Sequence, residues 1–251
     1  KYNTDLIKKD SEFKYYFIGL IAADGYISKS DNSIELTLAE KDIEILRLIR
    51  DHVCPELSVT KKPVTLNDKV YMAYRLKLSN EIIKEVVMIY INTTDKTNNL
   101  IFPYGIPDDY INHFMRGYND GDGTIGIKKG QQNVNGEIKY YYGTRLRVLG
   151  TRPFLQGFHI NAKRLCNIKF DVHPHKKGEE NVYGIEYSFS NANKVLDFIY
   201  RDATYYLQRK RVVFNHIRSS DNDSLAKVYG TIYSHYNTHG IVDIDEINNH
   251  N

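Results

Sequence analysis

Short runs of alternating apolar and polar residues recur along the chain, and longer runs with helical spacing separate them. A period of two is typical of half-buried β-strands, and we expect strands at 33–38, 57–65, 70–78, 144–149, 168–174 and 182–189. Amphipathic or apolar stretches of helical length occupy 40–53, 81–91, 150–165 and 195–214. This mixture predicts an α+β fold with antiparallel sheets.

The order of these elements occurs twice. Each half reads as helix, two strands, helix, two strands and helix, and the halves join at 98–107, where Pro103, Gly105 and Pro107 break the pattern. We therefore predict one subdomain at 1–104, a second at 105–217, and a polar tail at 218–251. The tail is expected either to pack on the body or to fray.

The repeat is sharpest at the helix that opens each half. Residues 16–27 read YFIGLIAADGYI and residues 114–125 read FMRGYNDGDGTI. The paired positions are Gly19 with Gly117, Ala23 with Gly121, Asp24 with Asp122, and Gly25 with Gly123. Small residues four apart share one helix face, so the two helices can approach closely.

Such packing would bring Asp24 and Asp122 together at the electronegative ends of both helices. Two carboxylates there repel each other unless a cation is present, and a hard divalent ion such as Mg²⁺ suits oxygen ligands. A single Asp-Gly would indicate only a turn, but two copies at equivalent positions favour a site. An EF-hand is excluded because its glycine and glutamate would fall on Ile125 and Gln131. Asp120 has only Ala22 as its counterpart, so we expect it to be solvated or locally hydrogen-bonded.

The two motifs, GLIAADG and GYNDGDG, resemble those of single-chain LAGLIDADG homing endonucleases. The segments KTNNLIFPYGIP (96–107), EKD (40–42) and YRDATYYLQRKR (200–211) support this resemblance, which covers roughly residues 12–217. It implies two pseudo-symmetric αββαββα subdomains, with the motif helices at their interface and a saddle-shaped antiparallel sheet surface for DNA.

The resemblance also implies a reaction and its residues. A divalent metal bound by Asp24 and Asp122, with the carbonyls of Ala23 and Gly121, would support hydrolysis of one phosphodiester per DNA strand, leaving short 3′ overhangs. Mg²⁺ is the expected ion. Mn²⁺ would substitute, and Ca²⁺ would bind without supporting efficient cleavage.

A basic residue often supports catalysis in this family. Lys41 matches that position in the first half, although it could equally be a solvated residue at a helix start. Arg152 is the corresponding candidate in the second half, with Thr151 as the alternative.

The polar face of the strands and the neighbouring turns form the predicted DNA-reading surface. In 70–78, Met72, Tyr74, Leu76 and Leu78 form the apolar set, opposite Tyr71, Ala73, Arg75 and Lys77. The predicted contacts are Tyr26, Ser28, Lys29, Glu35, Thr37, Lys61, Lys62, Tyr71, Arg75, Lys77, Thr124, Lys128, Lys129, Gln131, Lys139, Arg145, Arg147, His173, His175, Lys176, Lys177 and Glu186. Of these, Lys29, Lys61, Lys62, Lys128, Lys129, Gln131, Lys176 and Lys177 are assigned to turns.

The composition mainly excludes certain classes of protein and kinds of site. The 251 residues carry a net charge of +3, and 41% of them are hydrophobic, as in a globular protein. The two cysteines lie 112 positions apart, at 54 and 166, which excludes a disulfide framework and a cysteine-based zinc site. No apolar run is long enough to cross a membrane, so we expect a soluble, intracellular protein. The resemblance implies a monomer whose partner is a long double-stranded DNA site.

Two other interpretations stay open. A relative of the same fold could bind DNA or RNA without cleaving it, as an intron maturase or a regulator does; the two repelling acids argue against this. The endonuclease part of an intein is the other. Residues 12–217 leave too little chain for a splicing domain, so we interpret the terminal His250-Asn251 pair as coincidental.

Overall fold

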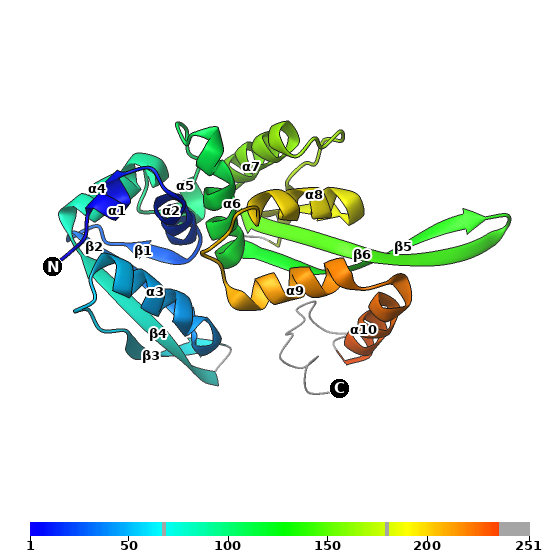
Figure 1. Ribbon diagram of the computed structural model, residues 1–251, viewed down its shortest axis with the longest axis horizontal. Coiled ribbons are helices and arrows are strands. Elements are labelled where there is room, and N and C mark those ends of the chain that lie inside the picture. Colours follow the sequence, from blue (N-terminus) through cyan, green and yellow to red (C-terminus); the bar gives the residue numbers. More distant parts are fainter. Residues whose placement is uncertain (67–68, 179–180, 236–251) are drawn as a thin grey trace.

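The computed structural model describes residues 1–66, 69–178 and 181–235, and it has two halves with the same order of elements (Figure 1). A short helix, α1 (Asp5–Lys8), precedes the first half. The first half contains α2 (Glu12–Asp24), β1 (Gly25–Ile27), β2 (Ser33–Ala39), the 3₁₀ turn η1 (Glu40–Asp42), α3 (Ile43–Val53), β3 (Thr60–Leu66), β4 (Lys69–Ser79) and α4 (Glu81–Ile91). The connection contains α5 (Lys96–Asn99).

The second half repeats this order and adds two helices. It contains α6 (Asp108–Asp122), β5 (Gly123–Val134), β6 (Glu137–Gly150), α7 (Arg152–Leu165), β7 (His175–Lys177), β8 (Val182–Ser188) and α8 (Phe189–Ile199), followed by α9 (Gln208–Ser219) and α10 (Asn222–His235). The two antiparallel sheets have equivalent strand orders, β1-β2-β4-β3 and β5-β6-β8-β7. The predicted α+β class and the αββαββα order of both halves are confirmed.

The motif helices α2 and α6 pack against each other between the halves (Figure 1). A Cβ at Gly19 would lie 2.2 Å from the carbonyl oxygen of Phe114, and one at Gly117 would lie 2.1 Å from that of Tyr16. Both helices are buried along most of their length, α2 from Phe13 to Ala22 and α6 from Ile111 to Asp120. The two halves therefore share one core around a contact that only glycine permits.

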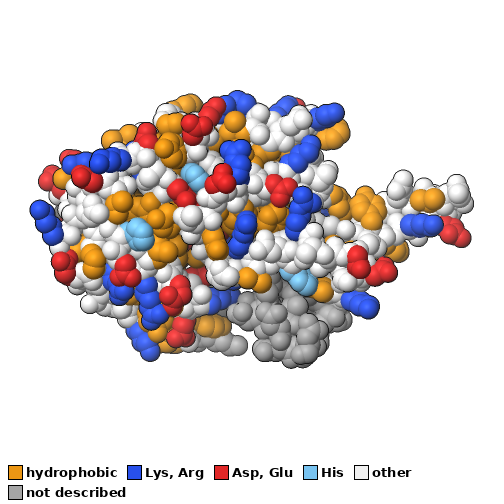
Figure 2. All heavy atoms as spheres, in the orientation of Figure 1, with side chains coloured by type: hydrophobic (Ala, Val, Ile, Leu, Met, Phe, Trp, Pro, Cys, Tyr) orange, Lys and Arg blue, Asp and Glu red, His pale blue; other side chains and the backbone are white. Residues whose placement is uncertain are grey.

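The β5–β6 hairpin is much longer than the sequence analysis predicted. Its strands meet at Asn135 (φ 54°) and Gly136 (φ 90°), which form the two-residue left-handed turn favoured in hairpins. Most of the residues assigned to turns are strand residues: Lys61 and Lys62 belong to β3, Lys128, Lys129 and Gln131 to β5, and Lys176 and Lys177 to β7. The hairpin projects beyond the helices as an arm (Figures 1 and 2).

Two predicted elements are wrong. The strand expected at 168–174 is a loop, in which the Val172 amide donates to Nε2 of His159 at 3.0 Å and Pro174 precedes β7. The stretch 195–214 is divided between α8 and α9, because the chain turns at Asp202 (φ 53°).

The polar tail begins as ordered helix. The predicted boundary at 217 falls inside α9, and α10 packs against β6, with the rings of Tyr142 and Tyr229 5.4 Å apart. Asn222 accepts a hydrogen bond from the Tyr142 amide at 2.9 Å. Residues 236–251, which include His250 and Asn251, lie outside the described residues.

Gly19→Ala and Gly117→Ala are each expected to lower the free energy of unfolding by about 1–3 kcal/mol or more, because a methyl group would overlap backbone atoms of the other helix. Denaturant unfolding measures this. Gly126→Ala is the matched control, since a Cβ there meets no atom within 4 Å. Equal stability of Gly19→Ala, Gly117→Ala and Gly126→Ala would contradict the close helix contact.

Candidate metal and DNA-binding site

Each motif helix ends at its motif acid, and the following glycine starts a strand. Gly25 and Gly123 are extended (φ −73° and −96°), so neither needs the left-handed conformation that often places glycine after a helix. Close packing explains them instead. A Cβ at Gly25 would lie 2.8 Å from Ile21, and one at Gly123 would lie 1.9 Å from Oδ1 of Asn119.

Asp24 and Asp122 are brought together as predicted. A Cβ at Gly121 would lie 3.0 Å from Oδ2 of Asp24, so the carboxylate of one helix lies against the backbone of the other. Burial raises the pKa of Asp24. Burial and the negative charge of Asp24 raise the pKa of Asp122 to about 6. The pair is therefore a like-charge site at the helix interface, with Asp24 exposed and Asp122 half-buried, and its ionised form is disfavoured.

Two lysines, which the sequence analysis did not single out, hold the helix ends beside these acids; Lys96 is half-buried and Lys210 is buried. Nζ of Lys96 donates to the carbonyl oxygens of Ile21, Ala22 and Ala23 at 2.6, 3.1 and 3.1 Å. A cation at a helix C-terminus satisfies carbonyls that lack a partner within the helix.

Lys210 does the same for α6. Its Nζ donates to the carbonyls of Asn119 and Gly123, each at 2.6 Å, and to that of Gly121 at 3.5 Å. Lys96 and Lys210 follow the closing helices α4 and α8, so they are equivalent in the two halves. Burial lowers the pKa of each to about 8, and the charges of both lower the pKa values of Asp24 and Asp122.

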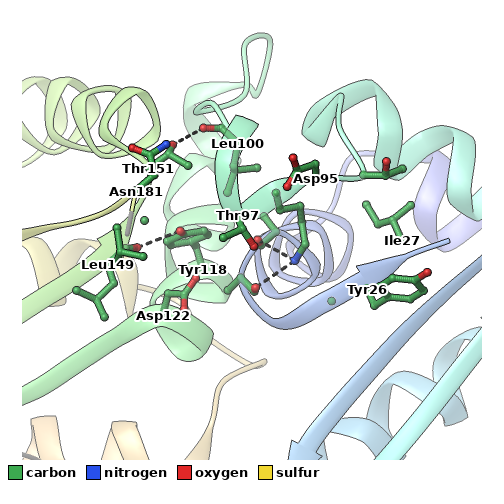
Figure 3. A pocket seen from close by; sticks show the side chains of 17 residues that line it. Tyr26, Ile27, Asp95, Thr97, Leu100, Tyr118, Asp122, Leu149, Thr151 and Asn181 are labelled. Atoms are coloured by element: carbon green, nitrogen blue, oxygen red, sulfur yellow. Dashed lines mark hydrogen bonds between the residues drawn. The ribbon is translucent and has the colours of Figure 1, made fainter. Parts of the chain in front are cut away.

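A cavity of about 410 Å³ adjoins the pair between the two halves. Tyr118 and Asp122 from α6 line one side, and Tyr26 and Ile27 from β1 line the other (Figure 3). Lys96 and Thr97 also line it. The acid on α6 is therefore accessible to a bound group in spite of its burial.

The three predicted supporting residues are placed differently. Lys41 is exposed in η1 and lines a separate cavity beside α9, with Asp42 and Gln208. Arg152 is exposed at the first position of α7. Thr151 is buried and caps α7, since its hydroxyl accepts from the Phe154 amide at 3.3 Å and also donates to the carbonyl of Leu100.

Asp120 is neither solvated nor local in its contacts, so that expectation is wrong. It is fully buried and accepts hydrogen bonds from the hydroxyls of Tyr16 and Tyr200, at 2.9 and 3.3 Å, and from the Leu207 amide at 2.8 Å. Tyr16 belongs to the other half, and Leu207 immediately precedes α9. Asp120 therefore fixes the connection that carries Lys210.

Strand register shows which predicted contacts share the open face of the sheets. Alternation places fifteen of them on the face opposite the buried side chains of each sheet. They are Tyr26, Glu35, Thr37, Lys62, Tyr71, Arg75, Lys77, Thr124, Lys128, Lys139, Arg145, Arg147, His175, Lys177 and Glu186. We call this set the open face. Lys29 and His173 are exposed in loops beside it.

Other predicted contacts lie elsewhere. Lys61, Lys129, Gln131 and Lys176 pair in register with Tyr74, Tyr142, Tyr140 and Tyr183, on the helix-facing side of the sheets. Ser28 is 5% exposed, and its hydroxyl accepts from the amides of Ser30 and Asp31, so it stabilises a turn. The two faces assigned within β4 agree with the register, although Met72 is exposed and Ala73 is buried.

Comparison with known proteins was made on sequence and on structure. No protein-family model matches the chain. A reverse gyrase from Methanocaldococcus jannaschii is 24% identical over 209 residues, which are 83% of this chain. The chain covers 11% of that protein, so the match concerns one segment of it.

Three solved structures share the fold. One is the LAGLIDADG homing endonuclease I-LtrWI bound to target DNA, with a TM-score of 0.52 and 9% identity over 92% of this chain and 98% of that one. The LAGLIDADG meganuclease I-CpaMI, bound to uncleaved DNA, has a TM-score of 0.52 and 13% identity, covering 90% and 98%. The meganuclease I-AabMI, also bound to uncleaved DNA, has a TM-score of 0.51 and 15% identity, covering 86% and 96%.

The chain has the LAGLIDADG fold. The fold expected from the two sequence motifs is thereby confirmed, with the motif helices at the interface of the two halves. Within the described residues, no helix is both long and apolar enough to span a lipid bilayer.

The two lysines were the main omission of the sequence analysis. Lys96 and Lys210 lie in the segments 96–107 and 200–211, which supported the family resemblance but were not aligned with each other. A lysine that follows the closing helix in both halves is a repeat signal. It is weak because the intervals from each motif acid differ, 72 residues for Lys96 and 88 for Lys210.

Asp122→Asn is expected to stabilise the metal-free protein at pH 8 by on the order of 1–3 kcal/mol. The pKa of Asp122 is about 6 in the folded protein, against 3.8 for an ordinary aspartate, so the folded state keeps its proton longer. Stability is therefore lost as pH rises between these values, and the cost is fully present above pH 6. The amide removes this cost.

Denaturant unfolding of wild type and Asp122→Asn at pH 4 and pH 8, with EDTA present, measures the effect. The gain should be small at pH 4 and largest at pH 8. Asp109→Asn, an exposed change at the start of the same helix, is the control and should show no such gain. A pH-independent effect of Asp122→Asn would contradict the raised pKa of Asp122 beside Asp24.

Proposed function

We propose that this protein is a metal-dependent endonuclease that cleaves both strands of a long DNA site, one phosphodiester per strand, leaving short 3′ overhangs. The observation that carries this proposal is the pair Asp24 and Asp122, one at the end of each motif helix, whose carboxylates lie close together at the interface of the two halves. No structural requirement of a helix end explains these acids, because helix C-termini favour cations.

The donor set suits a hard divalent cation. Asp24 and Asp122 supply carboxylate oxygens, and the carbonyls of Ala23 and Gly121 lie one residue before each acid. Oxygen-only donors with so few protein ligands are typical of Mg²⁺, which keeps several waters. When bound, the ion would polarise phosphate oxygens and make a bound water more acidic. Mn²⁺ is proposed to substitute, and Ca²⁺ to bind without efficient cleavage.

The chain's own groups would position this chemistry. The two carboxylates would hold the ion between the halves, so that each half would serve one DNA strand. Lys96 and Lys210 keep the helix-end carbonyls in place and offset part of the negative charge. They are better candidates for this supporting role than Lys41 or Arg152, because the charges of both lysines lower the pKa values of both acids.

Double-stranded DNA is the proposed partner. Basic side chains of the open face, among them Arg75, Lys77, Arg145 and Arg147, suit phosphates and guanine edges. A single chain supplies both acids and both sheets, so a monomer would suffice. The long β5–β6 arm extends this surface on the side of the second half.

Asp24→Asn and Asp122→Asn are each expected to abolish cleavage while preserving DNA binding, because the amide cannot bind the ion as a carboxylate does. The substrate would be a duplex selected by the wild type from a randomised library in Ca²⁺. Cleavage is then measured in Mg²⁺ and Mn²⁺, and binding by gel shift in Ca²⁺. Asp109→Asn should cleave like the wild type.

Undiminished cleavage by both variants would contradict the assignment of the metal site. If the wild type selects a duplex but cleaves it in neither ion, the protein is instead a DNA-binding relative of the fold, such as a regulator or a maturase.

A further inference from the structure

Glu186 lies among three cations in the middle of the open face. Its Oε1 accepts from Nζ of Lys128 at 2.5 Å, and its Oε2 accepts from Nε of Arg145 at 2.8 Å and from an Nη of Arg147 at 3.2 Å. These cations come from the two strands of the long hairpin, whereas Glu186 comes from β8. One carboxylate therefore ties three basic side chains together and leaves the cluster with a net charge of +2.

The cluster lies immediately beside the acid pair. Gly123, which follows Asp122, pairs with Val148, and the next row across the sheet is Thr124, Arg147 and Glu186. This is the first row of the open face beyond the catalytic centre. Its cations would meet DNA next to the proposed cleavage position.

The first half has the same pair with its charges exchanged. Gly25 pairs with Leu36 as Gly123 pairs with Val148, so Glu35 is equivalent to Arg147 and Lys77 is equivalent to Glu186. Glu35 contacts Lys77 and Arg75, each at 3.7 Å. The acid of this pair is on β2 in the first half and on β8 in the second, yet in both halves it lies beside cations.

The exchange of charges between the two halves argues against direct recognition of a DNA base by Glu186. A carboxylate that accepts from a cytosine amino group needs a free acceptor position, and Glu186 already uses three of its roughly four on the neighbouring cations. An acid that faced DNA alone would repel phosphates. Burial raises the pKa of Glu186, but the hydrogen bond from Lys128 and the charge of Arg145 outweigh it and bring the pKa to about 2. The carboxylate is thus ionised and committed to its neighbours.

We infer that Glu186 is a positioning residue, which fixes Lys128, Arg145 and Arg147 on the open face before DNA arrives. Holding flexible side chains in one geometry lowers the entropy lost on binding and aims the guanidinium groups at their acceptors. The acceptors share one chemistry, anionic or carbonyl oxygen, from guanine edges or from phosphates. This inference rests on the proposed DNA-binding function, but its first test does not.

The first experiment needs no DNA. In the intact chain, NMR of the arginine Nε–Hε groups reports how ordered each side chain is. Arg145 should be ordered and slow to exchange in the wild type, and mobile in Glu186→Gln. Glu137→Gln is the matched control, because it removes the same charge from an exposed position on the hairpin and should leave Arg145 ordered. Equal mobility of Arg145 in the wild type and Glu186→Gln would overturn the inference, whatever the protein binds.

The second experiment is selection from a randomised duplex library in Ca²⁺, with affinities measured against salt. Glu186→Gln should bind scrambled duplex more tightly but discriminate the selected site from it about tenfold less well than the wild type. Glu137→Gln should keep that discrimination, and Glu186→Asp should restore part of it. Lost preference at guanines indicates base edges as the acceptors; a general loss indicates phosphates. A changed preference at one cytosine alone, or unchanged discrimination, would overturn the inference.

Discussion

The close approach of two helix backbones determines the rest of this structure. At Gly19 and Gly117, each helix lies so near the other that a Cβ would fall within about 2 Å of a carbonyl oxygen. The two helices end together as a consequence, and so do the acids that terminate them. The sheets begin at the next residue of each helix, so their relative placement is fixed by the same contact. One packing constraint thus sets both the site and the surface around it.

That convergence creates an electrostatic conflict, which the chain resolves only in part. Burial and the proximity of a second carboxylate disfavour ionisation of Asp122, while Lys96 and Lys210 oppose this effect from the helix ends. Among the described residues, the two lysines donate to carbonyls and form no ion pair with the acids, so the carboxylate oxygens keep the capacity to bind a cation. Without a bound cation, the like charges of the two acids lower the stability of the fold. Such a loss of stability is expected at a functional site.

The sequence predicted the features that follow from local spacing. The repeat of Gly-x-x-x-small-Asp-Gly located both acids and the helix contact, and alternation in 144–149 and 182–189 placed Arg145, Arg147 and Glu186 on one face. Features that depend on distant contacts were missed or mistaken. Asp120 and Ser28 resemble surface residues in sequence, but one is enclosed by Tyr16, Tyr200 and Leu207 and the other caps a turn. Lys61, Lys129, Gln131 and Lys176 were assigned to turns, and only the register of the strands shows which side they face. The long hairpin is the exception among these, because its turn dipeptide Asn135-Gly136 is itself a local hairpin signal.

The central claim is that Asp24 and Asp122 together bind one or more divalent ions between the two motif helices. The most direct measurement is anomalous diffraction from a crystal of the protein with Mn²⁺ and a selected DNA duplex. The account predicts an anomalous peak within coordination distance of both carboxylates and of a DNA phosphate oxygen, about 2.0–2.3 Å. A fully occupied Mn²⁺ elsewhere, with both carboxylates ion-paired to Lys96 and Lys210 instead, would contradict it.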